Sequence, residues 1–225
     1  AFYACTGLAS VTASNGLVSI GDGAFYGCTG LSGLTLPNTV TSIGNYAFYN
    51  CSSLSNLALP SGVSSIGSYA FYGCAILDNV TISNALRSIG TCAFSGCPNL
   101  MVIAVSSSNP FFSSINGVLF NKGTNTLIQY PCANTGSYAV PSGVVSISPA
   151  AFYGCAGLTS VTIPRTVSSI GDGAFRDCLS LTAITVESLN TTYASMDGVL
   201  YNRSQGILVQ CPAGKSGNVV VSNGV

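Results

Sequence analysis

Cysteine is the residue type in this chain whose number and spacing could support chemistry. The sequence of 225 residues has ten cysteines and no histidine. Thiols act as nucleophiles, metal ligands or disulfide partners, but without histidine a nucleophile lacks its usual base and zinc lacks a common ligand. No Cys-x-x-Cys pair occurs, and the acidic residues are scattered: Asp22, Asp78, Asp172, Asp177, Glu187 and Asp197. The sequence therefore predicts no enzyme, no metal site and no cofactor.

Seven of the cysteines follow a fixed period. Each stands three positions after the phenylalanine of an Ala-Phe pair, and successive pairs keep one spacing (48 − 25 = 23) except for a single step of 58 (152 − 94 = 58). These seven form a cysteine column: Cys5, Cys28, Cys51, Cys74, Cys97, Cys155 and Cys178. A fixed period in the twenties is typical of a solenoid, in which each repeat stacks on the next.

Stacking limits what the cysteine column can do. Adjacent repeats lie about 4.8 Å apart, and side chains in register point the same way. Their Cβ atoms then stay beyond the separation of about 3.5–4.5 Å that a disulfide requires. We therefore interpret the column as small buried apolar side chains. A disulfide that uses Cys92, Cys132 or Cys211 is the alternative, and it would indicate an oxidising compartment.

The repeat unit reads I-G-x-x-A-F-x-x-C-x-x-L-x-x-L-x-L-P, as in residues 43–60. Its last part alternates, so that Leu57 and Leu59 face inward while Asn56 and Ala58 face outward, which predicts a short strand. Equivalent strands are expected at residues 8–13, 31–36, 77–82, 100–105, 158–163 and 181–186.

The other part of the unit has helical spacing. Val40, Ile43, Ala47, Phe48 and Cys51 lie at intervals that place them on one face of a helix. Residues favoured as helix N-caps follow the glycine in five units: Asp22, Asn45, Ser68, Thr91 and Asp172. The sequence therefore predicts an α/β solenoid with one short strand and one short helix in each repeat of about 23 residues.

The long step holds an insertion that recurs. Ile115–Asn121 and Thr126–Tyr130 are two β-type runs around a glycine-containing turn, which predicts a hairpin. The same pattern returns later in the chain, where Gly198–Asn202 matches Gly117–Asn121 at an offset of 198 − 117 = 81. We expect hairpin modules at about residues 106–140 and 187–221, within a single solenoid over residues 1–225. Because the chain begins and ends inside repeats, we expect it to be a fragment of a longer array.

Together, the repeat unit and the hairpin modules with D/N-G-V-L-F/Y-N resemble the BspA-like class of leucine-rich repeat proteins. The resemblance covers essentially the whole chain. It implies a curved, right-handed solenoid with strands on one side and short helices on the other. It also implies secreted or surface-attached proteins of bacteria and some protists, which adhere to host matrix or to other cells, or aggregate.

The composition limits the kinds of partner that the protein can bind. Only 5% of the residues are charged and the formal net charge is zero, so the chain lacks the basic surface that nucleic acid binding requires. No apolar run approaches the roughly 18 residues of a membrane-spanning helix. A surface with so little charge gives weak repulsion between molecules, which favours self-association.

Two stripes of residues are candidate binding surfaces. The first is the outward side of the strands, which we call the sheet face: Thr35, Asn56, Asn79, Thr81, Thr162 and Thr185. Solenoids bind partners on such extended surfaces, so a protein or glycan ligand is expected there, although exposed strand positions favour threonine without any ligand.

The second stripe is the tyrosine ladder, whose members directly follow the core phenylalanine: Tyr3, Tyr26, Tyr49, Tyr72 and Tyr153. Tyrosine is common at interfaces, so the ladder could join copies of the array, although packing along one solenoid is the simpler explanation. We expect a non-enzymatic cell-surface or secreted protein that adheres through its sheet face. The alternative is a structural protein that assembles into extracellular fibres or layers through lateral contacts.

Overall fold

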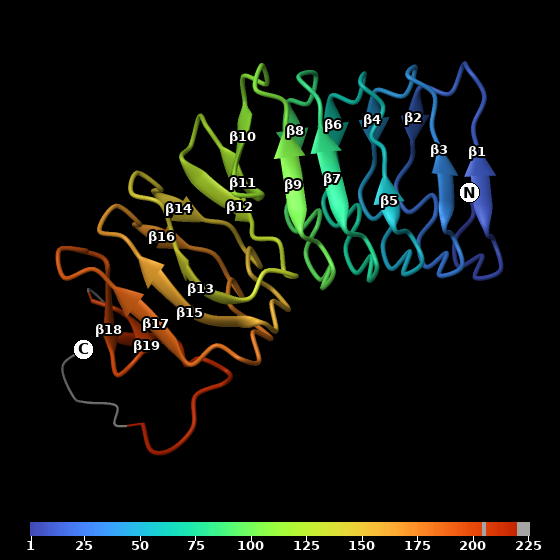
Figure 1. Cartoon of the computed structure of the whole chain (residues 1–225). Helices are drawn as coiled ribbons and strands as arrows, with labels where there is room; N and C mark the ends of the chain where they lie inside the picture. The colour runs from blue at the N-terminus through green and yellow to red at the C-terminus, as the bar shows by residue number, and fades with distance from the viewer. Residues whose placement is uncertain (204–205, 220–225) are drawn as a thin grey trace.

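The protein is a β-solenoid of stacked coils, shown in Figure 1. A computed structural model describes residues 1–203 and 206–219. Each coil has two short strands and a run of turns, so that three sides enclose the core. No helix occurs within those described residues. The solenoid prediction is confirmed, whereas the prediction of one short helix per repeat is wrong.

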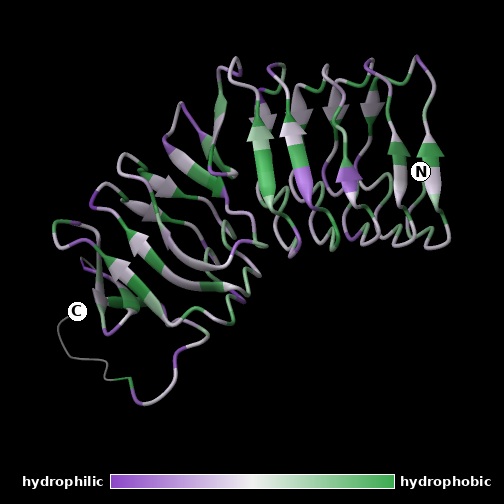
Figure 2. Ribbon diagram, in the orientation of Figure 1, coloured by the Kyte–Doolittle hydropathy of each residue, from purple (hydrophilic) through white to green (hydrophobic). Residues whose placement is uncertain are grey.

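The strands predicted at the end of the repeat units form one side of the coils. The strand at residues 158–163 has the expected bounds, and the others are shorter than expected. Neighbouring strands pair in parallel within three separate sheets, and Thr81, for example, lies beside Ala104 and Asn56 beside Asn79. The strands are β1 (Ser10–Thr12), β3 (Gly33–Thr35), β5 (Asn56–Leu57), β7 (Asn79–Ile82), β9 (Val102–Val105), β13 (Gly136–Ala139), β15 (Leu158–Ile163) and β17 (Ala183–Val186). Figure 2 shows apolar and polar residues within single strands such as β7, as expected for a sheet with one buried face.

A second parallel ladder forms where the sequence predicted the beginning of each helix. Its strands are only two residues long, always Ser-Ile, and they join one coil to the next. They are β2 (Ser19–Ile20), β4 (Ser42–Ile43), β6 (Ser65–Ile66), β8 (Ser88–Ile89), β14 (Ser146–Ile147) and β16 (Ser169–Ile170).

The third side is a run of turns whose backbone bonds to the next coil. Phe48 N–H donates to the carbonyl of Ala70 at 2.7 Å, and Phe71 N–H donates to Ala93 at 2.8 Å. An α-helix would instead direct each N–H to the carbonyl four residues earlier in the same segment. The helical spacing of apolar residues therefore reflects a tight bend around the core rather than a helix.

Left-handed residues explain why no helix forms on this side. Two positions per coil, four apart, have positive φ, and in the third coil these are Tyr46 at 55° and Asn50 at 54°. Left-handed residues cannot continue a right-handed helix. Glycine occupies the equivalent positions in the preceding coil, at Gly23 and Gly27, which is the sequence signal against a helix.

Two of the predicted helix caps, Asp22 and Asn45, act between coils instead. Asp22 Oδ1 accepts a hydrogen bond from Asn45 N–H at 2.6 Å, and Asn45 Oδ1 accepts one from Ser68 N–H at 2.8 Å. The side chain of the cap residue thus accepts a hydrogen bond from a backbone N–H of the next coil rather than from its own turn.

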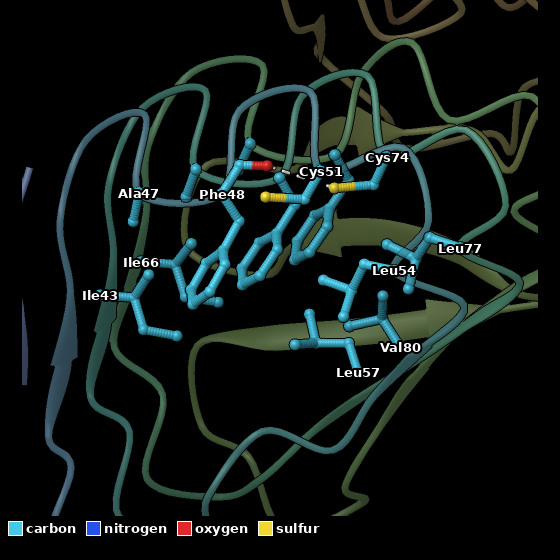
Figure 3. Close-up of a cluster of buried hydrophobic side chains, with 14 of the residues drawn as sticks. Ile43, Ala47, Phe48, Cys51, Leu54, Leu57, Ile66, Cys74, Leu77 and Val80 are labelled. Atoms are coloured by element: carbon cyan, nitrogen blue, oxygen red, sulfur yellow. Dashed lines mark hydrogen bonds between the residues drawn. The ribbon is translucent and has the colours of Figure 1, made fainter. Parts of the chain in front are cut away.

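The core is built from columns of identical side chains. Figure 3 shows the Phe48 ring in a row of stacked rings, with Cys51 and Cys74 beside them. Phe48 and Phe71 have ring centroids 5.2 Å apart and an interplanar angle of 4°. Offset stacking and complete burial make these rings a large source of apolar stabilisation.

The first hairpin module is a three-stranded antiparallel sheet of β10 (Phe112–Ile115), β11 (Val118–Asn121) and β12 (Thr126–Gln129). The predicted pairing around the turn at residues 122–125 is confirmed. The expected single run Ile115–Asn121 is divided, because Asn116 and Gly117 have positive φ and form a two-residue turn.

The second hairpin module repeats this arrangement with β18 (Tyr193–Met196), β19 (Val199–Asn202) and β20 (Ile207–Gln210). Asp197 and Gly198 take the place of the first module's Asn-Gly turn, again with positive φ. The predicted end of this module, at residue 221, lies outside the described residues.

A buried asparagine anchors each hairpin module. Asn109 Nδ2 donates to the carbonyls of Ser83 and Leu86, and its Oδ1 accepts from the N–H groups of Phe111 and Phe112. Asn190 makes the equivalent four bonds in the second module. Both donor hydrogens and both acceptor positions of each amide are thus used inside the protein.

Candidate binding surfaces and the junction at the hairpin coil

The sheet face has the exposure that the sequence predicted. All six of its named residues are exposed: Thr35, Asn56, Asn79, Thr81, Thr162 and Thr185. Strands β1 and β3 carry the first part, β5, β7 and β9 the next, and β15 and β17 the last. The hairpin turn separates β9 from the later strands, since Ile103 N–H donates to Gly117. The face is therefore two uncharged surfaces of hydroxyl, amide and small side chains.

The tyrosine ladder is continuous over the first four coils. The ring centroids of Tyr3 and Tyr26 are 4.8 Å apart, and those of Tyr26 and Tyr49 are 4.7 Å apart, with nearly parallel planes. Tyr49 and Tyr72 continue the stack at 5.0 Å, and Tyr153 follows at 5.8 Å with a tilt of 34°. The pKa of the Tyr72 phenol is raised, mainly because the side chain is partly buried, so this hydroxyl stays neutral.

Two further tyrosines, which the predicted ladder does not include, widen it. Tyr46 and Tyr69 stack on each other at 5.0 Å, and each is tilted against the ladder tyrosine of its own coil, Tyr49 or Tyr72. Their repeat spacing (69 − 46 = 23), three positions before the ladder tyrosines, was the available signal. Ladder and flanking pair together form an aromatic surface that is partly exposed along its length.

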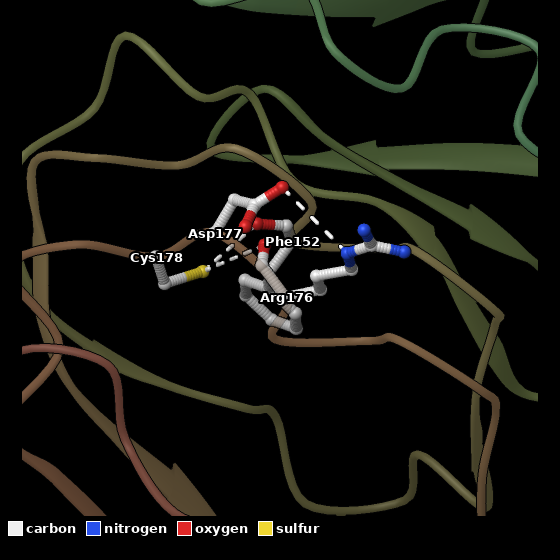
Figure 4. A network of polar contacts seen from close by, with 4 residues as sticks. All are labelled: Phe152, Arg176, Asp177 and Cys178. Carbon is white, nitrogen blue, oxygen red and sulfur yellow. Dashed lines mark hydrogen bonds and ion pairs between the residues drawn. The ribbon is translucent and has the colours of Figure 1, made fainter.

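The ladder ends where Arg176 replaces tyrosine. Figure 4 shows Arg176 beside Asp177, with an Nε–Oδ2 distance of 3.7 Å, while Cys178 donates through Sγ to the carbonyl of Phe152 at 3.0 Å. Both charged side chains are mostly exposed, so the pair adds little stability. The core columns thus continue past this point, but the aromatic surface does not.

Most of the cysteine column is buried and free of disulfides, as the sequence predicted. Cys28, Cys51, Cys74, Cys97 and Cys178 are buried free thiols, whereas Cys5 on the first coil is exposed. Cys51 Sγ donates to the carbonyl of Phe25 at 3.1 Å, and the same bond recurs along the column. Burial raises the pKa of Cys51 to about 12, which keeps this thiol protonated and unreactive.

One in-register pair contradicts the argument against disulfides within the column. Cys132 and Cys155 form a disulfide across 23 residues, with Cα atoms 4.2 Å apart. Cys132 occupies a column position, which its spacing from Cys155 indicated. The short Cα separation occurs where the hairpin module changes the length of the coil. Cys92 and Cys211, the other proposed partners, are free.

The coil of the first hairpin module is shorter than its neighbours on the turn side. Leu127 pairs with Ile147, so five residues lead from Leu127 to Cys132 (132 − 127) but eight lead from Ile147 to Cys155 (155 − 147). We call this coil of the first hairpin module, which includes residues 127–132, the hairpin coil. Because it is three residues shorter, its backbone cannot cover the whole turn side of the coil before it.

Gln129 bridges part of this deficit. Its side chain is buried, accepts from Ser95 Oγ at 2.9 Å and donates to the carbonyls of Tyr130 and Ala151. Ser95 Oγ also lies 3.2 Å from the carbonyl of Ala150. A small polar network therefore separates the stacked phenylalanines up to Phe94 from the next stack, which begins with Tyr130 on Phe152 at 5.0 Å.

Two cavities have lining residues on both the coil before and the coil after the hairpin coil. One, the ladder-gap cavity, has a volume of about 330 Å³ and lies between the coil of β8 and the hairpin coil, with Ile89, Phe94, Asn121, Thr126 and Gln129 among its lining residues. The other has about 410 Å³ and lies at the end of the tyrosine ladder, lined by Tyr69, Tyr72, Tyr153, Asp172 and Arg176 among others. Cys92 and Pro149 line both cavities.

Metal-ligating side chains do not cluster in the part of the chain that the structure describes. Within residues 1–203 and 206–219, no three side chains of His, Cys, Asp or Glu gather closely enough to hold a metal ion. The same residues include no helix that is long and apolar enough to cross a bilayer.

Comparison with solved structures identifies similar solenoids. A leucine rich cell surface protein from Faecalibacterium prausnitzii A2-165 is 34% identical, with a TM-score of 0.70, over 82% of this chain and 56% of that chain. A leucine-rich repeat protein from Eubacterium ventriosum ATCC 27560 is 25% identical, with a TM-score of 0.62, over 80% of this chain and 60% of that one. The pneumococcal vaccine antigen PcpA, 23% identical with a TM-score of 0.66 over 80% and 51%, shares the fold.

The chain thus spans between 51% and 60% of the length of these three proteins. No curated protein matches it. The family model of the BspA type leucine rich repeat region matches residues 1–127 and 125–205 in six copies. These residues hold the core columns, both parallel ladders and both hairpin turns described above. The chain therefore belongs to the BspA-type leucine-rich repeat family.

Proposed function

We propose that this protein is a non-enzymatic cell-surface or secreted protein that adheres to a protein or glycan ligand through its sheet face. The observation that carries the proposal is the exposed, uncharged side chains on the outward side of the strands, in register between β1 and β3 and again along β5, β7 and β9. Hydroxyl and amide groups at the strand spacing can bond a ligand at many points without a charged anchor. The extended side of a solenoid suits such distributed binding.

Two further observations support an extracellular location. The Faecalibacterium relative is named a cell surface protein. The disulfide between Cys132 and Cys155 is of a kind that persists in oxidising environments.

A triple variant tests the sheet face. Thr35→Lys, Asn56→Lys and Thr81→Lys place three ammonium groups along the row, and the matched control places three on exposed turns as Asn15→Lys, Asn38→Lys and Asn84→Lys. The native chain is applied to an array of extracellular-matrix proteins and mucin-type glycans. We expect the sheet-face variant to lose at least tenfold in affinity while the control retains it. Equal retention by both variants would reject the sheet face.

The aromatic surface favours self-assembly as a second candidate function. Partly exposed stacked tyrosines, flanked by Tyr46 and Tyr69, could pack side by side with those of another array. Polar capping repeats fused to both ends prevent end-to-end sticking, and electron microscopy over a concentration series then detects lateral fibres or layers. Tyr26→Glu, Tyr49→Glu and Tyr72→Glu should abolish such assemblies, whereas the sheet-face variant should not. Single rods of the native array at every concentration would reject this candidate.

A further inference from the structure

The ladder-gap cavity exists because a repeated hydrogen-bond pattern is interrupted there. Between regular coils, Gly67 N–H donates to the carbonyl of Ile43, and Gly171 N–H donates to that of Ile147. In the opposite direction, Phe48 N–H donates to the carbonyl of Ala70. Each coil therefore offers its neighbour one carbonyl from the Ser-Ile strand and N–H groups from the turn side.

The coil of β8 offers the same groups but receives no partner from the hairpin coil. Among the described residues, strand β8 pairs only with β6, and no N–H donates to the carbonyl of Ile89. Cys92 N–H and Phe94 N–H, whose counterparts on earlier coils bond to the next coil, likewise have no acceptor in that part of the chain. Buried backbone groups are nearly always hydrogen-bonded, and Phe94 is only 1% exposed.

The interruption recurs with the hairpin modules. The second module has a smaller cavity of about 110 Å³ lined by Ile170, Phe175, Val209 and Gln210 among others. Each of these follows its counterpart in the first cavity by the offset between the modules, since 170 − 89 = 81 and 210 − 129 = 81. The counterparts are Ile89, Phe94, Ile128 and Gln129. The cavity is therefore a property of the module and not an accident at one site.

We propose that the ladder-gap cavity binds a short uncharged or acidic peptide segment of a partner protein. The peptide completes the hydrogen bonding that is interrupted between the coil of β8 and the hairpin coil. The groups left open are those that a regular coil bonds to the backbone of the next coil, so a peptide backbone has the complementary chemistry. The volume of about 330 Å³ falls at the low end of ligand pockets. Completing an open strand edge is a recurring mode of peptide recognition. Arg87 is the one charged side chain in the lining, and its guanidinium can form an ion pair with an acidic residue of the peptide.

The chain itself supplies the probe. Residues 20–24 and 170–174 both read Ile-Gly-Asp-Gly-Ala, the segment that carries the donating glycine N–H and the accepting alanine carbonyl in a regular coil. The capped peptide acetyl-Ile-Gly-Asp-Gly-Ala-amide is therefore titrated into the full chain. The control peptide carries an N-methyl group on its first glycine, which removes the N–H that would donate to Ile89.

Amide NMR spectra and hydrogen exchange report the result. We expect saturable shifts at Cys92 and Phe94, at least tenfold slower exchange of the Phe94 amide proton, and at least tenfold weaker binding of the N-methylated peptide. Ser88→Trp, at the mouth of the cavity, should weaken binding at least tenfold, whereas Ser19→Trp in the first strand of the same ladder should not. Both serines are exposed, so both variants should fold.

Three results would overturn the proposal. They are no saturable shift up to about 1 mM peptide, equal binding of the two peptides, or shifts confined to residues outside the cavity. The last two would mean that the peptide binds without completing the ladder. The cavity does not involve the sheet face, so the triple lysine variant should bind the peptide normally whether or not the sheet-face proposal holds.

Discussion

The boundaries between the coils that precede the hairpin coil, and the boundary at the hairpin coil itself, use equivalent sequence positions with different results. Between the coils of Phe48 and Phe71, rings stack at 5.2 Å and the turn-side N–H groups are bonded. At the hairpin coil the phenylalanine stack stops at Phe94, Gln129 fills part of the gap, and a cavity remains. Coils of equal length satisfy one another's backbone hydrogen bonds, whereas an inserted coil of different length leaves some backbone groups without partners. The core accordingly divides into two apolar clusters that meet near Val118 and Leu119.

The largest expected effect lies inside the regular array. Phe71 is fully buried between two rings, whereas Phe2 on the first coil is 46% exposed and stacks on one ring only. Phe71→Ala should lower the free energy of unfolding by about 3–5 kcal/mol, the usual cost of a large buried cavity. Phe2→Ala should cost about 1 kcal/mol or less. Urea denaturation measures both, and similar losses would show that the stacked column does not stabilise the array as described.

The next effect concerns the anchor of the hairpin module. Asn109→Ala leaves two carbonyls and two N–H groups, buried or partly buried, without their partners, so it should cost about 2–4 kcal/mol. Asn190→Ala should cost a similar amount, because its four bonds are equivalent. Exposed Asn84→Ala is the control and should change the melting temperature little. A small loss for Asn109→Ala would mean that the module is held by its apolar contacts instead.

A smaller effect separates backbone strain from crowding at the hairpin turn. Gly117 has a φ of +81°, and a Cβ there would lie 3.2 Å from the carbonyl oxygen of Met101 and 3.3 Å from Val102 Cα. Gly136 has a similar φ of +85° with nothing within 4 Å. Alanine at Gly136 should cost about 1 kcal/mol from strain alone, and alanine at Gly117 about 2 kcal/mol. Thermal melts compare the two, and equal costs would show that the turn moves away freely from β9.

The smallest effect is a pH dependence of stability that arises from the buried thiols. Burial raises the pKa of Cys97 to about 12 and that of Cys178 to about 11, above the ordinary value of 9.0. Because the folded pKa is raised, the stability from each protonated thiol is fully present below pH 9 and is lost as pH rises toward the folded pKa. The melting temperature should therefore fall above pH 9, and Cys51→Ala with Cys97→Ala should flatten that fall. An unchanged slope would assign the alkaline loss to other groups.

Much of this comparison could be predicted from the sequence. The constant repeat period established the stacking, the alternation at Leu57 and Leu59 located one sheet, and the recurrence of the hairpin pattern identified the modules. Exposure of Thr35 and Asn79 on the sheet face also followed from alternation, because strand side chains point to opposite faces in turn. Whether these residues bind a ligand, and whether the tyrosines join arrays, remain proposals.

Only the tertiary structure decided how the backbone is satisfied. The spacing of apolar residues around Phe48 fits a helix or a bend equally. The backbone forms a bend because its N–H groups bond to the neighbouring coil, and the pattern within one repeat does not indicate such bonds. The disulfide of Cys132 and the open edge at Ile89 arise from the shorter hairpin coil, a difference that matters only when coils are stacked. Sequence period thus determines which residues are neighbours, and the contact between coils determines which of their polar groups are left open.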